Sequence, residues 1–369
     1  MIANEANWYG TNEQQMKVGL RVTLDQKSKL LKKRWPKVAL IIVLVLVLLG
    51  IVGSIYQEQS KQAELIQYPP LGKMVEVEGK QMHVYVQGEG DVTIVLASGH
   101  GTENPYVDFY PLHEKLSEQA KVVIYDRFGY GWSDKTSVPR DIDTITQELH
   151  TLLHEIGEKG PYLFVAHSIA SLEAIRFAQS HPDEVAGIVL LDAGNPTFYE
   201  TYESPSKAVQ KIMQTLNNIG VLRMLSHIEA VADTLLQPEE GYGQHIPESL
   251  KKLQLAMFLK NFSNDTVIDE MLYLQSNAKK VIDAGHLGDL PLIWFTSGIN
   301  QQVIQGWSES QEELAEWSTN NKQIILDRAG HYVHHHEPGL IIEEISNLTK
   351  AFLQKNRDAS EKSEVATIK

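Results

Sequence analysis

The order of apolar and polar residues divides the chain into three parts. Residues 38–55 form an apolar run of eighteen positions without a charged side chain. At about 1.5 Å per residue, an α-helix of that length spans roughly 27 Å, close to the hydrocarbon core of a bilayer. A polar stretch over residues 56–70 follows, and residues 71–355 alternate between short apolar runs and amphipathic segments. This pattern predicts a membrane-spanning helix, a polar stem and a globular domain.

Eight apolar runs in the globular part have the length and residue types of β-strands. From residue 93 onward they alternate with helical patterns, which is typical of a mostly parallel sheet with helices on both faces. The predicted strands are Met74–Val77, Met82–Val86, Thr93–Leu96, Val122–Tyr125, Tyr162–Val165, Val185–Leu191, Leu292–Phe295 and Gln323–Leu326. The predicted helices between and after them are Tyr110–Glu118, Ile142–Ile156, Ser171–Gln179 and Leu340–Leu353.

The alternation is interrupted at residues 195–289, where no strong strand pattern occurs. Helical patterns at Ser206–Leu216 and Pro247–Phe262 predict a helical insertion. Open α/β sheets bind their ligands beyond the carboxyl ends of the strands, and we expect the insertion to lie above that edge as a cap. Residues 356–369 are polar and are expected to form a frayed tail.

The net charge of −14 is distributed unevenly along the chain. Residues 1–55 carry eight Lys and Arg against three acidic residues, and the remaining chain carries 25 against 44. The basic segment 1–37 precedes the apolar run, so the positive-inside rule predicts a cytoplasmic N-terminus, a single-pass anchor in the cell membrane and an extracytoplasmic domain. A cleaved signal peptide is the alternative, although no A-x-A site follows the run. The acidic domain argues against nucleic-acid binding.

The composition limits the available chemistry. Apolar residues make up 43% and charged residues 22%, as in ordinary globular proteins, which excludes a wholly disordered chain. The chain has no cysteine, which excludes disulfides, zinc–thiolate sites, iron–sulfur clusters and a cysteine nucleophile.

Ser168 lies in a segment that predicts an exposed nucleophile. The predicted strand Tyr162–Val165 runs into Ala166-His-Ser-Ile-Ala170, and a helical pattern follows. A serine between two small residues on a strand–turn–helix is the pattern of a nucleophile elbow. Glycine is usual at both flanking positions, and alanine tolerates a positive φ less well. An ordinary helix N-cap is the alternative interpretation of Ser168.

A glycine turn, Ser98-Gly-His-Gly101, follows the third predicted strand. We expect its backbone to bind an oxyanion together with the residue after the nucleophile, because such N–H donors stabilise the negative charge that develops during acyl transfer. The expected donors are the N–H groups of Ile169 and His100, with Gly101 as the alternative to His100.

A second loop, Asp126-Arg-Phe-Gly-Tyr-Gly-Trp-Ser-Asp134, follows the fourth predicted strand. We expect Asp126 and Arg127 to pair with each other and to support the site, and we do not expect them to react.

His331 comes just past the last predicted strand, in Asp327-Arg-Ala-Gly-His331. A histidine at this place can take the proton from Ser168 and return it to the leaving group. Three further histidines, His334–His336, raise the question of a metal site. No HExxH pattern is present, and we predict neither a metal nor a cofactor.

Residues 74–353 resemble the α/β-hydrolase superfamily. The resemblance rests on the S-G-x-G turn, the D-R-x-G-Y-G-W-S-D loop, the serine elbow and an L-x-D-A-x-x-P segment after the sixth predicted strand. It implies an eight-stranded α/β-hydrolase fold and hydrolysis of an ester or amide through an acyl-enzyme. Carboxylesterase or lipase-like action is favoured over aminopeptidase or acyltransferase action.

The resemblance implies two positions for the acid that orients His331. Most members carry it after the seventh strand, where this chain has Asn300 and no carboxylate. The other position is the end of the sixth strand, where Asp192 lies, and we favour Asp192. Glu309 and Glu312 are more distant substitutes.

Two functions remain open from the sequence. The first is a membrane-anchored serine hydrolase acting on a small ester or amide. The second is a catalytically silent relative that binds a ligand or a partner, which the alanine-flanked elbow and the displaced acid suggest. The oligomeric state is not predicted.

Overall fold

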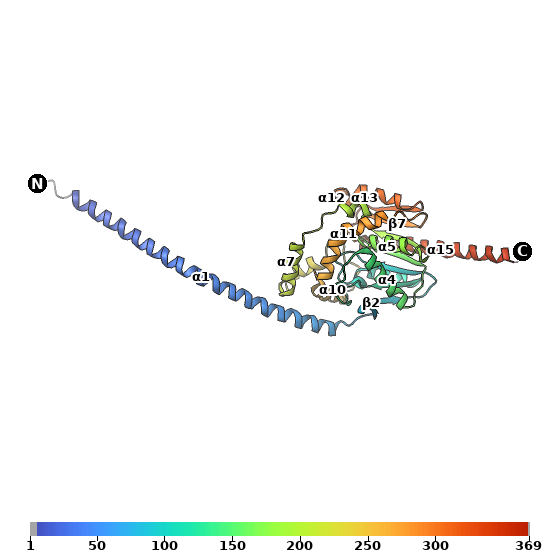
Figure 1. Ribbon diagram of the computed structural model, residues 1–369, viewed down its shortest axis with the longest axis horizontal. Helices are drawn as coiled ribbons and strands as arrows, with labels where there is room; N and C mark the ends of the chain where they lie inside the picture. Colours follow the sequence, from blue (N-terminus) through green and yellow to red (C-terminus); the bar gives the residue numbers. More distant parts are fainter. Residues whose placement is uncertain (1–5, 368–369) are drawn as a thin grey trace.

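The predicted strands form a single eight-stranded sheet in the computed structural model, which describes residues 6–367 (Figure 1). The strand order is β1-β2-β4-β3-β5-β6-β7-β8; β2 pairs antiparallel with β1 and with β4, and all other pairs are parallel. The strands are β1 (Lys73–Val77), β2 (Lys80–Gln87), β3 (Thr93–Ala97), β4 (Lys121–Tyr125), β5 (Tyr162–His167), β6 (Val185–Leu191), β7 (Leu292–Ser297) and β8 (Asn321–Leu326). Each one overlaps a predicted strand.

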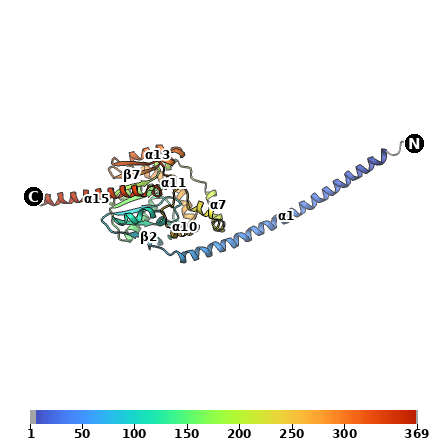
Figure 2. The same ribbon diagram turned by 180° about the vertical axis from the view of Figure 1, so that it is seen from behind.

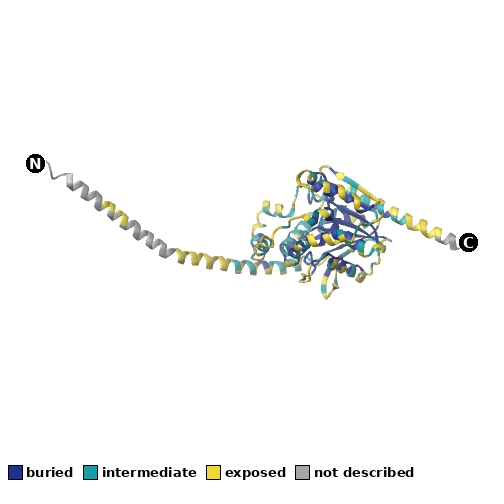
Figure 3. Ribbon diagram, turned by 45° about the horizontal axis from the view of Figure 1, so that its top comes forward, coloured by how far each residue is buried: buried dark blue, intermediate teal, exposed yellow. Residues whose placement is uncertain are grey.

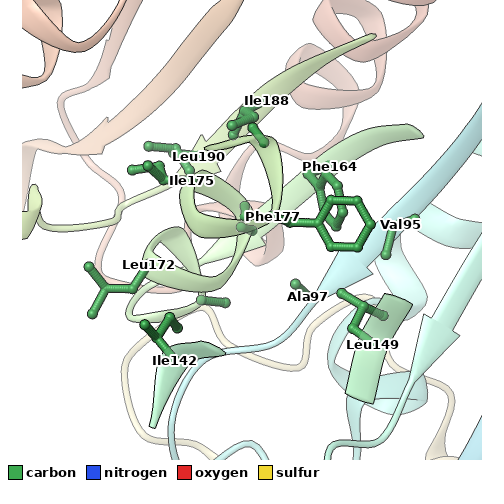
Figure 4. Packing of buried hydrophobic residues seen from close by; sticks show 14 of the residues in the cluster. Val95, Ala97, Ile142, Leu149, Phe164, Leu172, Ile175, Phe177, Ile188 and Leu190 are labelled. Carbon is green, nitrogen blue, oxygen red and sulfur yellow. The ribbon is translucent and has the colours of Figure 1, made fainter. Parts of the chain in front are cut away.

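Helices cover both faces of this sheet because every central strand is apolar on both sides. In β5, Phe164 belongs to one buried cluster, whereas Leu163 and Val165 belong to the other. Successive side chains of a strand point to opposite faces, so each cluster marks one face. Figure 4 shows the first cluster, in which Phe164 lies beside Phe177 of α5. The helices outside the insertion are α2 (Pro105–Asp108), α3 (Tyr110–Leu116), α4 (Ile142–Glu155), α5 (Ala170–Ser180), α12 (Gly298–Val303), α13 (Trp307–Glu313), α14 (Val333–His336) and α15 (Pro338–Thr367).

The interrupted region between β6 and β7 is helical, as predicted. Its helices are α6 (Pro196–Thr201), α7 (Lys207–Asn218), α8 (Val221–Leu225), α9 (Glu229–Leu236), α10 (Glu248–Asn261) and α11 (Asp265–Asp283). We call residues 195–289 the cap. Asn195 and Asn264 cap the first turns of α6 and α11 with their side chains, which explains where these two helices begin.

The N-terminal part of the chain is one long helix, α1 (Ala6–Gln67), which extends away from the domain (Figures 1 and 2). Its segment Trp35–Gln67 is long and apolar enough to cross a membrane, and the most apolar window has a mean hydropathy of 3.2 and no buried residue. In Figure 3 the ribbon of α1 is coloured as exposed over residues 35–49 and becomes partly buried where it reaches the domain. The helix fits a membrane anchor or a signal segment.

Two polar segments outside the predicted elements, the stem and the tail, are helical. The predicted stem continues α1 to Gln67, because residues 56–67 contain good helix formers and no Gly or Pro before Pro69. The predicted tail continues α15 to Thr367 for the same reason, and residues 368–369 lie outside the described part.

Candidate functional site

Ser168 occupies the sharp turn between β5 and α5. Its φ of 55° lies in the left-handed region, and its N–H donates to the Leu191 carbonyl at 3.1 Å. Such a conformation in a residue other than glycine is strained and is often found at functional sites. The flanking residues Ala166 and Ala170 are buried, and their φ angles are not positive. The strain falls on Ser168 itself, so alanine in place of glycine imposes no backbone penalty.

Asp192 follows β6 and lies against the imidazole of His331. Asp192 Oδ2 is 2.8 Å from His331 Nδ1, and the carboxylate is fully buried whereas the imidazole is about one-third exposed. Three further donors hold this carboxylate. They are the Ser297 N–H at 2.8 Å, the Asn300 side-chain amide at 2.6 Å and the Trp307 indole N–H at 3.1 Å. Of the two positions considered for the acid, Asp192 is therefore the one that contacts His331 with a carboxylate.

The glycine turn after β3 packs directly against the serine turn. A Cβ on Gly99 would lie 3.0 Å from the Ser168 Cβ and 2.9 Å from His167 Nδ1, so only glycine fits there. Gly101 has a φ of 78°, and its N–H lies 3.5 Å from the Tyr130 hydroxyl. Ile169 is the N-cap residue of α5, and N–H groups at a helix start have no partner within the helix.

The predicted pairing of Asp126 with Arg127 is wrong. Asp126 Oδ2 accepts from the Trp132 N–H at 2.9 Å and lies 2.9 Å from His83 Nδ1. Arg127 points elsewhere, since consecutive side chains at a strand end point in opposite directions. Its guanidinium donates to the Ser98 carbonyl at 2.7 Å and to the Gly99 carbonyl at 3.3 Å. Arg127 thus supports the glycine turn, as expected of this loop, by contacts that the sequence did not indicate.

Glu270 of α11 connects the cap to this turn. Its carboxylate lies 2.8 Å from Arg127 Nε and 3.1 Å from His100 Nδ1, and it accepts a short hydrogen bond from the Tyr130 hydroxyl. Burial raises the pKa of Glu270, but Arg127 and His100 outweigh burial and lower the pKa to about 2. The carboxylate is therefore ionised at neutral pH. The sequence carries no signal for this contact, because 143 positions separate Arg127 from Glu270.

Tyr199 of α6 is a second residue that the sequence analysis missed. Its buried hydroxyl accepts from the Gly194 N–H at 3.1 Å and lies close to the Ser168 side chain. Burial raises the pKa of Tyr199, which keeps the phenol protonated. A signal for α6 was present, since Asn195-Pro196 is a typical N-cap and first helical position.

Glu239, between α9 and α10, holds the backbone beside the imidazole. Its two carboxylate oxygens accept from the His331 N–H at 2.6 Å and from the Tyr332 N–H at 2.9 Å. The same side chain lies 3.0 Å from His336 Nε2. A cap residue thus fixes the loop that carries His331.

A pocket of about 300 Å³ opens beside these loops. One wall is the glycine turn from His100 to Asn104, and another is Tyr332, the neighbour of His331. The cap supplies apolar side chains, which include Leu235, Leu236, Phe258 and Phe262. The pocket therefore lies between the cap and the carboxyl ends of the strands, at the edge of the sheet where the sequence pattern predicts ligand binding.

Three buried residues, Asp108, His334 and His335, come close enough together to be considered as metal ligands. His335 Nε2 lies 3.3 Å from Asp108 Oδ1, and the Gly243 N–H donates to His335 Nδ1 at 3.3 Å. A nitrogen that accepts a hydrogen bond carries no proton, so the proton of a neutral His335 is on Nε2 and faces Asp108. This arrangement is a hydrogen-bond network that joins α2, α14 and the cap, and it offers no free lone pair from His335 Nε2.

The chain is similar to proteins with the α/β-hydrolase fold. The model of the alpha/beta hydrolase fold family matches residues 93–219. The uncharacterized protein YbdG of Bacillus subtilis (strain 168) is 28% identical over 305 residues, which cover 81% of this chain and 90% of YbdG. A 2-(acetamidomethylene)succinate hydrolase of Mesorhizobium japonicum is 23% identical over 122 residues, 33% of this chain and 42% of that protein. The crystal structure of a bromoperoxidase from Bacillus anthracis matches with a TM-score of 0.57 and 16% identity, covering 73% of this chain and 96% of that one.

The sheet order and the helical cap define the fold. The chain has an α/β-hydrolase fold, and over residues 93–219 its sequence is similar to the alpha/beta hydrolase fold family.

Proposed function

We propose that this chain is a serine hydrolase that cleaves an ester, or an amide, through an acyl-enzyme. Ser168 is the nucleophile, His331 the general base and acid, and Asp192 the carboxylate that orients the imidazole. The observation that carries this proposal is the 2.8 Å contact between Asp192 Oδ2 and His331 Nδ1. It favours the tautomer with the proton on Nδ1, which leaves Nε2 free to accept a proton from a hydroxyl.

The reaction follows from these roles. His331 Nε2 takes the proton of the Ser168 hydroxyl as Oγ attacks the substrate carbonyl carbon. The N–H groups of Ile169 and His100 stabilise the oxyanion, and we favour His100 over Gly101 because the Gly101 N–H faces Tyr130. The imidazolium then protonates the leaving alcohol or amine, which departs. Water, deprotonated by Nε2, attacks the acyl-enzyme, releases the carboxylic acid and restores Ser168.

The pocket favours an ester with an apolar acyl or alkyl group. The apolar cap residues on its wall would contact such a group, whereas a strongly anionic substrate would meet the acidic domain. Carboxylesterase or lipase-like action is therefore the proposed activity, ahead of aminopeptidase or acyltransferase action.

We also propose that α1 anchors the protein in the cell membrane, with the N-terminus in the cytoplasm and the hydrolase domain outside. The support is the exposed apolar run at residues 38–55 with basic residues before it. Protease added to intact cells is expected to digest the domain, and protection of the domain would overturn this orientation.

A fluorophosphonate probe tests the serine mechanism, because it reacts only with an activated serine. The folded chain should be labelled, Ser168→Ala should abolish labelling, and Ser137→Ala, at an exposed loop serine, should leave it unchanged. If the folded wild-type chain stays unlabelled, or if Ser168→Ala is labelled equally, the hydrolase mechanism fails and a silent binding protein becomes the better description.

A further inference from the structure

The end of α1 nearest the domain is packed against the cap without intervening side chains. A Cβ on Gly53 would lie 2.1 Å from the Ile219 carbonyl oxygen, and a Cβ on Gly220 would lie 2.9 Å from the Gly53 carbonyl oxygen. Only two glycines allow the two backbones to approach so closely. The corner between α7 and α8 is therefore joined to α1 inside its apolar run, which ends at residue 55.

Polar contacts hold this junction in place one turn further along α1. Gln57 is buried; its side-chain amide donates to the Leu259 carbonyl of α10 at 2.8 Å and accepts from Arg223 Nε of α8 at 2.5 Å. Arg223 also forms a two-pronged ion pair with Glu64 of α1. Because α8 and α10 both bind this part of α1, the position of the cap along the axis of α1 is fixed.

Large apolar side chains are exposed on the cap next to this junction. We call the set the cap patch; it consists of Val209, Ile212, Met224, Leu225 and Ile228, which are 37–63% exposed. In α7, the apolar positions 209, 212, 213 and 216 lie on one face at helical spacing. Figures 1 and 2 both place α7 on the side of the domain from which α1 leaves. An amphipathic helix with an uncovered apolar face is typical of segments that lie in a membrane interface.

We infer that the cap patch is a membrane-docking surface that lies in the interface of the bilayer crossed by α1. This inference rests on the proposed anchor. If residues 38–55 span the bilayer, Gly53 lies near its surface, and the contact with Ile219 brings the α7–α8 corner to the same level. The side chains of Leu48, Ile51 and Val52, which directly precede this junction in α1, are exposed and apolar as well. The attachment of the cap to the proposed span at Gly53 favours lipid over a second copy of the chain as the occupant.

Docking in this way brings the pocket close to the lipid. Ile228 of the cap patch directly precedes α9, whose last residues Leu235 and Leu236 line the pocket. The substrate class that fits is an amphiphilic ester that enters from the bilayer with its apolar chain on the α9 side.

The absence of cysteine makes this inference directly testable. A bimane fluorophore is attached to a single introduced cysteine in the full chain, which is placed in phosphatidylcholine vesicles. The variants are Leu46→Cys, Ile212→Cys, Met224→Cys and Ile325→Cys, each at an exposed apolar position. Acyl-brominated phosphatidylcholine is the quencher. We expect quenching at Leu46 in α1 and at both cap-patch positions, and none at Ile325 in the edge strand β8. Far-UV circular dichroism verifies that each labelled variant is folded.

The outcomes separate the docking surface from the anchor. Quenching at Leu46 with none at Ile212 and Met224 would overturn the docking surface and leave the anchor intact. No quenching at Leu46 would reject the anchor and the docking surface together. Protection of Ile212 and Met224 from aqueous iodide without quenching by brominated lipid would also overturn the inference, because a second protein copy would then cover the cap patch.

Discussion

At the scale of single residues, the site depends on which group faces His331 Nδ1. Asn300 occupies the position where most relatives were expected to carry the acid, yet its amide donates to Asp192 and lies 3.3 Å from the same imidazole nitrogen. An amide that donates to the carboxylate stabilises the ionised form and the orientation of Asp192. Asn300, after β7, therefore supports Asp192, the proposed acid at the end of the neighbouring strand β6.

Replacing these two residues should give very different effects. Asp192→Asn removes the charge that stabilises the imidazolium and exchanges an acceptor for a donor, and a loss of about 10⁴-fold in reactivity is expected. Asn300→Ala removes one of four donors to Asp192, and we expect about a tenfold loss. The measurement is the second-order rate constant of fluorophosphonate labelling, which requires no knowledge of the substrate. A larger loss of labelling rate from Asn300→Ala than from Asp192→Asn would mean that Asp192 is not the acid that orients His331.

The Gly99→Ala variant tests the contact between the glycine turn and the serine turn. The added Cβ would lie 2.9 Å from Nδ1 of the buried His167 ring and 3.0 Å from the Ser168 Cβ, so one of the two turns must shift. A displacement of about 1 Å at a reacting group costs on the order of 100-fold in rate. Gly339→Ala, at an exposed position at the start of α15 with open space around it and no positive φ, controls for the general effect of losing a glycine. Equal labelling rates in both variants would show that the close packing has no role in reactivity.

At the scale of elements, the strands were predictable and their long-range contacts were not. Apolar runs such as Val185–Leu191 predicted the central parallel strands, because such strands are buried on both faces. The same logic placed Ser168, Asp192 and His331 at strand ends on one edge of the sheet. Glu239 and Glu270 were not predicted as site residues, because they lie in the cap, whose docking on the sheet depends on tertiary contacts. In addition, the sequence alone does not distinguish an exposed glutamate from a buried one.

Glu239 gives a test of how the cap supports His331. Glu239→Gln keeps one oxygen acceptor but places an NH₂ group against a backbone N–H, which should lower the free energy of unfolding by about 1–3 kcal/mol. Since the affected N–H groups belong to His331 and Tyr332, the labelling rate of Ser168 should fall as well. The adjacent Glu240→Gln removes the same charge from an exposed side chain and should change neither quantity. Equal effects of the two substitutions would mean that they result from the loss of negative charge, and not from the loss of the hydrogen bonds that Glu239 accepts from the His331 and Tyr332 N–H groups.

At the scale of the whole molecule, the stability of the fold should depend on keeping buried histidines neutral. Burial lowers the pKa of His113 in α3 to about 4, and burial also lowers the pKa of His335 to about 4. In the unfolded chain both groups titrate near 6.5. Between pH 6.5 and pH 4 the unfolded state therefore binds more protons than the folded state, and the free energy of unfolding falls as the pH falls.

His113→Phe should remove a defined part of this acid sensitivity. Neither ring nitrogen of His113 has a hydrogen-bond partner among the described residues, and the ring packs against Tyr106 and Tyr110 at centroid distances of 4.8 and 5.4 Å. Phenylalanine fills this space without a protonation site. From its pKa shift, His113 alone accounts for about 3 kcal/mol of stability lost between pH 7 and pH 4. Urea unfolding of the variant should show a correspondingly smaller loss over this range, whereas His154→Phe at an exposed position should behave as the wild type. Parallel pH profiles of wild type and His113→Phe would show that His113 is not held neutral by the fold, and would leave the acid sensitivity to other histidines with lowered pKa values, such as His167 and His335.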